Sequence, residues 1–271
     1  MGRAACQWAF NQCDVDGTIQ VIMQVKAIKT RLLLTPKDDL FGALSKAIKK
    51  LPERSVVAIA SKVVSVHQGR CIARSKVKHK DELIAREAER YLPRHLTPNR
   101  FAVLTVKYNT LIPTAGIDES NAGDYYILWP KQPEKAAWEL RAFLRKKYHV
   151  NKLGVIIVDS HTIPLRRGVV GTALSYAGFK PLNDYRGTKD LFGRKFKIST
   201  VDIPDALATA AVLVMGEGTE RTPAAVISNV PFVTFIPGKY KPKGNHASWT
   251  ISWDEDLYGP LFKAVKWRKK K

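Results

Sequence analysis

The sequence has little cysteine and no long apolar run. Its three cysteines, Cys6, Cys13 and Cys71, are scattered and form no CxxC pair, so a disulfide framework is not expected. This cysteine usage is typical of a reducing, cytoplasmic setting. No stretch approaches the roughly 18 apolar residues that a membrane helix requires, and the first twenty residues lack the apolar core of a signal peptide. We therefore expect a cytoplasmic protein without a membrane partner.

Several common catalytic and nucleotide-binding motifs are also absent. The chain contains no GxxxxGK[ST] phosphate loop and no GxGxxG between a strand and a helix. It has no HExxH, no GxSxG and no His/Cys cluster at zinc-ligand spacing. These absences argue against P-loop, Rossmann, zinc-enzyme and serine-hydrolase designs.

Acidic residues are few beside basic ones. Lys and Arg number 45 against 24 Asp and Glu, which gives a net charge of +21. This excess predicts a positive surface potential and anionic partners, but it does not determine the fold. Of the 271 residues, 45% are hydrophobic, enough for a packed core, so a mainly disordered chain is excluded.

Strand and helix signals alternate along most of the chain and predict an α+β fold. Strands are expected at 17–28, 55–66, 101–108, 124–129, 153–158 and 224–237. Helices are expected at 39–51, 80–92, 134–147 and 206–215. The strand 55–66 would be interrupted by Ser61 and Lys62, an unusual place for a lysine unless it marks an edge or faces an anion.

Three acidic residues lie where a loop or a strand end would expose them. Asp118 follows Ala-Gly-Ile, Asp159 directly follows the buried strand 153–158, and Glu217 lies between two glycines. Mg²⁺ prefers carboxylate, carbonyl and hydroxyl oxygens and keeps waters and substrate phosphates as its other ligands. Three acids from distant segments would suit such a site, although each one alone is also typical of a turn or a helix cap.

Basic residues accompany these acids. Arg166 and Arg167 follow Asp159 by seven and eight residues, so they are expected near the same opening. Arginine binds carboxylate or phosphate with two parallel hydrogen bonds, although adjacent arginines are also common as solvated charge. The segment 184–194 places charges around two glycines, which suits either a functional loop or an exposed hairpin.

Seven short motifs in order resemble the coenzyme F420-0:γ-glutamyl ligase family. They lie at 37–40, 60–65 with 69–70, 115–118 with 120–121, 154–159, 166–168, 184–187 with 190–194, and 215–218. The likeness spans 28–228. It implies a two-lobed α+β fold in an intertwined homodimer, with a catalytic domain at 1–245 followed by a basic extension at 246–271.

The resemblance also implies site residues. Asp118 and Asp159 would hold a divalent metal, Mg²⁺ or Mn²⁺, and Ser160 and Glu217 would serve a second one. Nucleotide contacts would fall on Thr30, Arg31, Leu32, Leu33, Ser61, Lys62, Asn121, Met215, Gly216, Gly218, Thr219, Glu220, Arg221 and Thr222. Arg166 and Arg167 would act in catalysis, by orienting a carboxylate or stabilising the transferred group.

The implied reaction consumes GTP or ATP. A phosphoryl group would pass to a carboxylate of the acceptor, and the amine of L-glutamate would then displace phosphate to form an amide. The acceptor would be an anionic, cofactor-like molecule, either F420-0 or a folate. The chain departs from the family at Val66, where a lysine is usual, at Ser160, where threonine is usual, and at 111–114. These departures favour a subfamily with another acceptor, such as the relatives that extend folates.

The alternative hypothesis is a basic nucleic-acid-binding protein without ligase activity. Its support is the net charge and the tail 263–271, in which six of nine residues are basic. Such a tail is usually a solvated end, but Trp267 favours packing or stacking, and Tyr240 lies between two lysines. Against this hypothesis, no RNA- or DNA-binding module is present and the basic residues form no single stripe.

Overall fold

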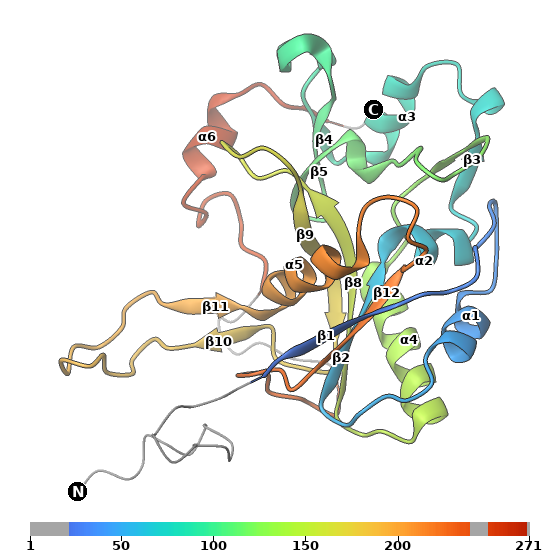
Figure 1. The fold of residues 1–271 in the computed structure, drawn as a ribbon. Helices are drawn as coiled ribbons and strands as arrows, with labels where there is room; N and C mark the ends of the chain where they lie inside the picture. Colours follow the sequence, from blue (N-terminus) through green and yellow to red (C-terminus); the bar gives the residue numbers. More distant parts are fainter. Residues whose placement is uncertain (1–21, 239–248, 270–271) are drawn as a thin grey trace, which may run out of the picture.

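A five-stranded sheet forms the centre of the molecule. The computed structural model describes residues 22–238 and 249–269, so Cys6, Cys13, Tyr240 and the start of the predicted strand 17–28 lie outside it. The strand order is β1 (Gln24–Ile28), β12 (Ala224–Ser228), β2 (Ser55–Ala60), β8 (Leu153–His161) and β9 (Val170–Ala177) (Figure 1). Strands β2 and β8 are parallel, and the other neighbours are antiparallel.

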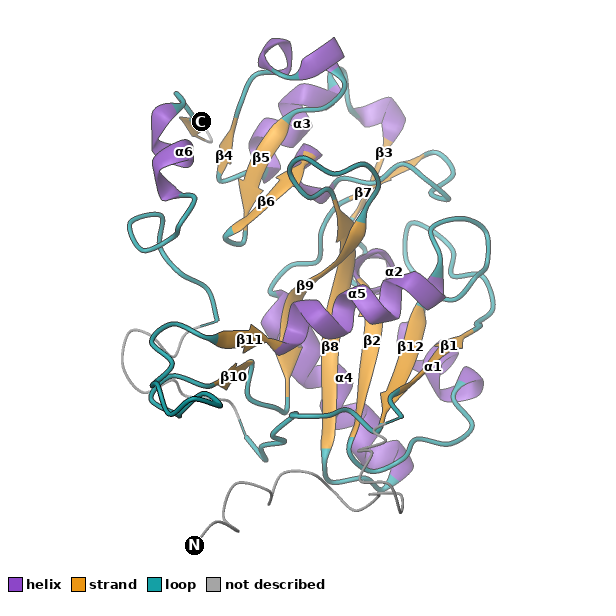
Figure 2. Ribbon diagram, turned by 60° about the vertical axis from the view of Figure 1, so that its left-hand side comes forward, coloured by secondary structure: helices purple, strands orange, loops and turns teal. Residues whose placement is uncertain are grey.

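Helices cover both faces of this sheet. Helices α1 (Leu40–Ala47) and α4 (Pro133–Tyr148) lie on one face and α5 (Ile203–Met215) on the other (Figure 2). Alternate residues of a strand point to opposite faces, and β2 follows this rule. Val57 packs with the core on the α4 side, and Val56 packs with the core on the α5 side. The strand is therefore apolar at nearly every position, as a strand buried on both faces must be.

A smaller lobe packs beside the carboxyl end of β8. Its four-stranded sheet has the order β13 (Arg268–Lys269), β4 (Arg90–Tyr91), β5 (Leu104–Lys107) and β6 (Thr110–Pro113). Helix α3 (Lys80–Glu87) covers it, and β3 (Cys71–Ala73) pairs with β7 (Tyr125–Ile127) nearby (Figure 2). The mixture of helices with several separate sheets confirms the α+β prediction.

A two-stranded arm projects from the body (Figure 1). It consists of β10 (Leu182–Asp184) and β11 (Thr200–Asp202), joined by the exposed segment 185–199. The arm contains 184–194, so the exposed-hairpin interpretation of that segment is confirmed.

Four predicted elements were wrong in extent. The strand predicted at 224–237 ends at Ser228. The strand predicted at 55–66 ends at Ala60, and helix α2 (Ser61–His67) begins there, so Ser61 and Lys62 do not interrupt a strand. The valine-rich run favours a strand by propensity, but burial of the helix decides the conformation. The helix predicted at 80–92 ends at Glu87 because Arg90–Tyr91 pairs with β5. The helix predicted at 39–51 ends at Ala47.

The C-terminal segment packs against the smaller lobe. Helix α6 (Gly259–Ala264) precedes β13, which pairs with β4. The Trp267 indole N–H donates a hydrogen bond to the Phe262 carbonyl at 2.7 Å, and its ring lies 5.8 Å from that of Trp253. The backbone of 263–269 is therefore ordered and not frayed, but all of its residues except Trp267 are exposed. The solvated-end interpretation holds for its basic side chains, and the expected packing of Trp267 is confirmed. None of the helices in the described ranges is long and apolar enough to cross a membrane.

Packing between α5 and β9 depends on a glycine. A Cβ added to Gly171 would lie 2.2 Å from the Ala208 carbonyl oxygen, which is helix backbone and cannot move alone. We predict that Gly171→Ala lowers the free energy of unfolding by about 1–3 kcal/mol, measured by urea denaturation. Gly238→Ala is the control, since nothing lies within 4 Å of its added Cβ. Equal stability of the two variants would contradict this packing.

Candidate active site

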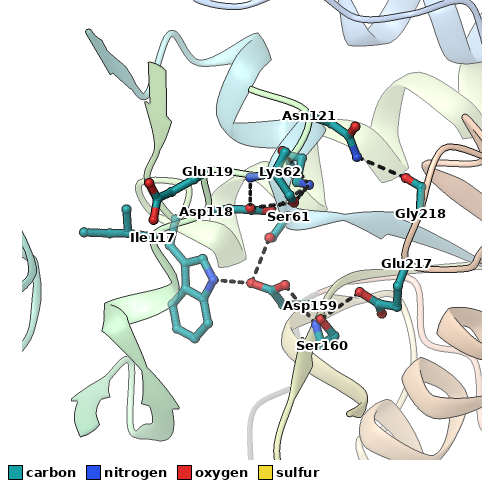
Figure 3. Close-up of polar contacts among 12 residues, drawn as sticks. Ser61, Lys62, Ile117, Asp118, Glu119, Asn121, Asp159, Ser160, Glu217 and Gly218 are labelled. Carbon is teal, nitrogen blue, oxygen red and sulfur yellow. Dashed lines mark hydrogen bonds and ion pairs between the residues drawn. The ribbon is translucent and has the colours of Figure 1, made fainter. Parts of the chain in front are cut away.

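Two cavities meet at the carboxyl ends of β2 and β8. The first has a volume of about 210 Å³, and the second has about 270 Å³. Both are lined by the same set of residues where they adjoin, which we call the shared wall: Ser61, Lys62, Asp118, Ser120, Ile127, Asp159, Ser160 and Glu217. Figure 3 shows most of these side chains pointing toward one another.

The first cavity gathers nearly all the predicted nucleotide contacts. Every residue of that set except Thr219 lines it. Val66, which stands at the usual lysine position, also lines this cavity. These residues come from segments far apart in the chain, so their convergence is a result of the fold.

The second cavity extends from the shared wall toward the smaller lobe. It is lined by Ile112, Pro113 and Thr114, part of the run in which the chain departs from the family pattern. His161 and Thr162, which directly follow Ser160 in the sequence, also line this cavity.

Asp159 is the most buried acid of the shared wall. Strand β8 carries it, and three hydrogen bonds hold its carboxylate. Oδ2 accepts from the Ser61 hydroxyl at 3.1 Å and from the indole N–H of Trp129. Oδ1 accepts from the Ser160 backbone N–H at 2.8 Å. No cation among the described residues forms an ion pair with it.

Asp118 has the opposite environment. The Lys62 ammonium lies 2.6 Å from its Oδ2, and the backbone and hydroxyl of Ser120 donate to its Oδ1 at 2.6 and 2.7 Å. Lys62 also donates to the carbonyl and hydroxyl of Ser120. The start of α2 and the loop after Gly116 are thereby joined.

The loop that follows α5 completes the wall. The Ser160 hydroxyl donates to Glu217 Oε2 at 3.2 Å, and the Asn121 amide donates to the Gly218 carbonyl at 3.0 Å. These two bonds connect the 215–218 segment to β8 and to the Asp118 loop (Figure 3).

The two aspartates have pKa values shifted in opposite directions. Burial raises the pKa of Asp159 to about 6, despite the hydrogen bonds from Trp129, Ser160 and Ser61 that favour the charged form. Burial also acts to raise the pKa of Asp118, but the Lys62 charge and the Ser120 hydrogen bonds outweigh it and hold the pKa below its ordinary value. Asp159 is therefore the carboxylate that a bound cation would stabilise most.

The donor set fits a hard divalent cation that is completed by a substrate. Within residues 22–238 and 249–269, no group of three or more His, Cys, Asp or Glu side chains could hold a metal by itself. Mg²⁺ is commonly held by one or two carboxylates together with waters and phosphates. Asp159, Ser160 and Glu217 offer such oxygens, whereas Asp118 is paired with Lys62.

Arg166 and Arg167 do not join this group. They lie in the exposed loop between β8 and β9, and neither lines either cavity. Strand β8 continues to His161 beyond Asp159, which carries the loop outward. The two ends of that loop, Thr162 and Val169, do line the second cavity.

Sequence reasoning missed Trp129. It is 1% exposed and follows strand β7, and its indole contacts Asp159 directly. A Cβ added to Gly116 would lie 2.1 Å from its Nε1, so the Asp118 loop passes against the ring only because residue 116 is glycine. One tryptophan without a spacing pattern gives no signal that could have found it.

The chain is similar in sequence to known proteins over most of its length. The sequence model of a family described as F420-0:Gamma-glutamyl ligase matches residues 27–229. A Methanopyrus kandleri protein named coenzyme F420:L-glutamate ligase is 37% identical over 75% of this chain and 86% of its own. Proteins of the same name from Methanococcus maripaludis and Methanocaldococcus jannaschii are 33% and 32% identical, over 83% and 70% of this chain and 94% and 82% of their own.

The raised pKa of Asp159 predicts a pH-dependent cost in stability. In the unfolded chain the carboxyl ionises near 3.8, and in the folded protein near 6. The folded state therefore binds the extra proton between these values, and stability falls as pH rises from about 4 to 6. Asp159→Asn removes this cost, so its stability relative to the parent should increase over that range by up to about 3 kcal/mol. Urea denaturation at pH 4, 5, 6 and 7 measures the difference, and a difference independent of pH would contradict the assignment.

Proposed function

The chain belongs to the F420-0:γ-glutamyl ligase family, and we propose that it acts as a coenzyme F420:L-glutamate ligase, forming an amide between L-glutamate and a carboxylate of F420-0. The observation that carries this proposal is the shared wall. Oxygen donors from three distant segments, Asp118, Asp159 with Ser160, and Glu217, converge between two adjacent cavities. Transfer of a group between two bound substrates requires that their binding sites adjoin, as these two cavities do.

We assign the nucleotide to the first cavity. Its phosphates would lie against the 215–222 segment and the start of α2, with the Lys62 ammonium as a nearby cation. The Arg31 guanidinium is already held by Asp38 through two hydrogen bonds of 2.7 and 2.6 Å, so it shapes the rim and is less available to phosphate. GTP, as in the resemblance, is the expected nucleotide, with ATP as the alternative.

We assign the acceptor carboxylate to the second cavity, against the shared wall. One of its oxygens attacks the γ-phosphorus, the bond to the leaving nucleoside diphosphate breaks, and an acyl phosphate forms. The ammonium of L-glutamate loses one proton to solvent, the resulting amine attacks the acyl carbon, phosphate leaves, and the nitrogen loses a second proton, so that the amide keeps one N–H. Phosphoryl transfer asks a protein mainly for positioning and charge neutralisation.

A divalent cation fits the wall through Asp159, Ser160 and Glu217, and Asp118 would join it by exchanging Lys62 for the cation. When bound, Mg²⁺ or Mn²⁺ would neutralise the phosphate charge. Lys62 would then be released toward the transferred group, which links nucleotide binding to the charge of the Asp118 loop.

The arginines keep a proposed role at the entrance. Arg166 and Arg167 lie between Thr162 and Val169, both of which line the second cavity. A guanidinium at this position would attract the carboxylates of glutamate or of the acceptor. The exposure of both arginines suits capture of a substrate from solvent better than a fixed contact.

Two other hypotheses, nucleic-acid binding without ligase activity and a folate acceptor, gain no support from the comparisons. Membership in a ligase family argues against a nucleic-acid-binding protein without ligase activity. The relatives compared above are named for F420, so folate glutamylation gains no support from them. A folate is therefore included as the alternative acceptor in the assay described below.

Homodimer formation is the proposed assembly. The tip of the β10–β11 arm presents Leu191 and Phe192 with 100% and 90% of their surface exposed, and Ile198 nearby is 86% exposed. Large apolar side chains gathered on a projecting arm are typical of an interface. A second copy of the chain is the partner implied by the family resemblance.

The substrate assignment predicts a mass change. Incubation of the protein with GTP, Mn²⁺, L-glutamate and F420-0 should yield a product heavier by one glutamate residue, and a parallel reaction with a folate should not. Asp159→Ala should reduce the rate by on the order of a hundredfold or more, whereas Arg167→Ala should mainly raise the KM for the carboxylate substrates, because this arginine is exposed and lines neither cavity. Asp254→Ala, an exposed acid of the C-terminal segment, is the control and should be as active as the parent. Full activity in Asp159→Ala would refute the assignment.

The arm predicts the oligomeric state. Light scattering should give a dimer for the parent and a monomer for the double variant Leu191→Asp, Phe192→Asp, because two charges would have to be buried at the interface. Leu257→Asp, at a residue that is 85% exposed in the C-terminal segment, should remain dimeric. Dimers in both variants would place the interface elsewhere.

A further inference from the structure

Asp159 is held by a tryptophan from the other lobe. The ring of Trp129 is almost fully buried, and its indole N–H is one of two donors to Oδ2 of Asp159. The other donor to this oxygen is the Ser61 hydroxyl. Trp129 therefore links the loop after β7 to the acid on β8.

The ring itself has little freedom to move. Tyr108 lies parallel to it, with ring centroids 6.2 Å apart and an angle of 8° between the planes. The Lys107 ammonium lies 6.0 Å from the ring centroid, and the Arg70 guanidinium donates to the Trp129 carbonyl at 3.2 Å. Gly116 lies directly against the edge of the ring that carries Nε1.

Two of the residues that contact Trp129, Arg70 and Lys107, are themselves held by an acid, Glu87, in a charged cluster. Glu87 Oε2 accepts from Arg70 at 2.7 Å and from Lys107 at 2.9 Å, and the Lys107 side chain is only 5% exposed. The cluster belongs to the smaller lobe, on helix α3, strand β5 and the segment before β3. The position of the indole is therefore set from two sides, by this cluster of the smaller lobe and by the core on the α4 side of the large sheet, in which Trp129 is buried.

The hydrogen bonds distinguish the two oxygens of Asp159. A carboxylate oxygen accepts about two hydrogen bonds. Oδ2 has both positions filled, whereas the Ser160 N–H is the one donor to Oδ1 within the described ranges. The free acceptor position is thus on Oδ1, on the side of Ser160 and Glu217 (Figure 3).

We propose that Trp129 is a positioning residue that fixes the carboxylate of Asp159 so that Oδ1 is the oxygen presented to a divalent cation. This inference rests on the proposed function, since it assumes that Asp159 binds the cation. Hydrogen bonds from surrounding groups orient metal ligands, and their loss typically weakens metal binding 10–100-fold.

The test is direct binding of Mn²⁺, measured by titration calorimetry on the full chain with GDP at the same concentration in cell and syringe, because the protein donors of the described ranges alone do not complete the site. Trp129→Phe keeps an aromatic ring and removes the N–H, so we expect Mn²⁺ to bind about 10–100-fold more weakly. In the ligase assay the Mn²⁺ concentration at half-maximal rate should rise by a similar factor, while kcat at saturating Mn²⁺ changes much less. The second variant, Ser61→Ala, removes the other donor to Oδ2 with little change of volume and should weaken binding in the same direction.

Trp138→Phe is the matched control. Trp138 lies half-buried on α4 and packs against the core, away from the shared wall. It should bind Mn²⁺ like the parent. Parental Mn²⁺ affinity in folded Trp129→Phe, or equal weakening in Trp138→Phe, would overturn the positioning role and leave the ligase proposal intact. A parent that neither binds Mn²⁺ nor forms the glutamylated product would overturn both.

Discussion

The arrangement depends on one buried, unpaired carboxylate. Asp159 lies at the carboxyl end of the central strand β8, where burial raises its pKa to about 6 and no cation of the described chain lies against it. A charge in such a place costs free energy unless it is compensated. Protein donors from three segments, Ser61, Trp129 and Ser160, compensate it in part. A divalent metal ion would supply the remaining positive charge and could at the same time bind the phosphates of the nucleotide.

The two lobes contribute different parts of this arrangement. The large sheet supplies the acid, the start of α2 and the loop after α5, which together form one face of each cavity. The smaller lobe supplies the Asp118 loop and Trp129, which close the second cavity. A parallel pair, β2 and β8, brings Ser61 and Asp159 to the same edge of the sheet because both strands end there. The two cavities thus meet where the strands end.

The sequence was sufficient to predict most residues of the site, but not the residues that hold them in position. Short motifs identified Asp118, Asp159, Ser160 and Glu217, and the structure brings them to one wall, because their loops follow apolar elements that fix their positions. The strand predicted through Ser61 was wrong because valine suits both strand and buried helix. Arg166 and Arg167 line neither cavity, because β8 continues for two residues past Asp159 and their exposed loop begins only there. Trp129 gave no signal, since its contact with Asp159 arises only after three segments have packed together.

The proposed reaction requires a cation at the shared wall, beside Oδ1 of Asp159. Anomalous diffraction from crystals grown with Mn²⁺ and a nucleoside diphosphate tests this directly. The account predicts an anomalous peak between the two cavities, within about 2.0–2.3 Å of that oxygen, with the phosphates of the nucleotide on its other side. A Mn²⁺ peak that touches neither Asp159 nor Glu217, with the nucleotide bound elsewhere, would contradict it.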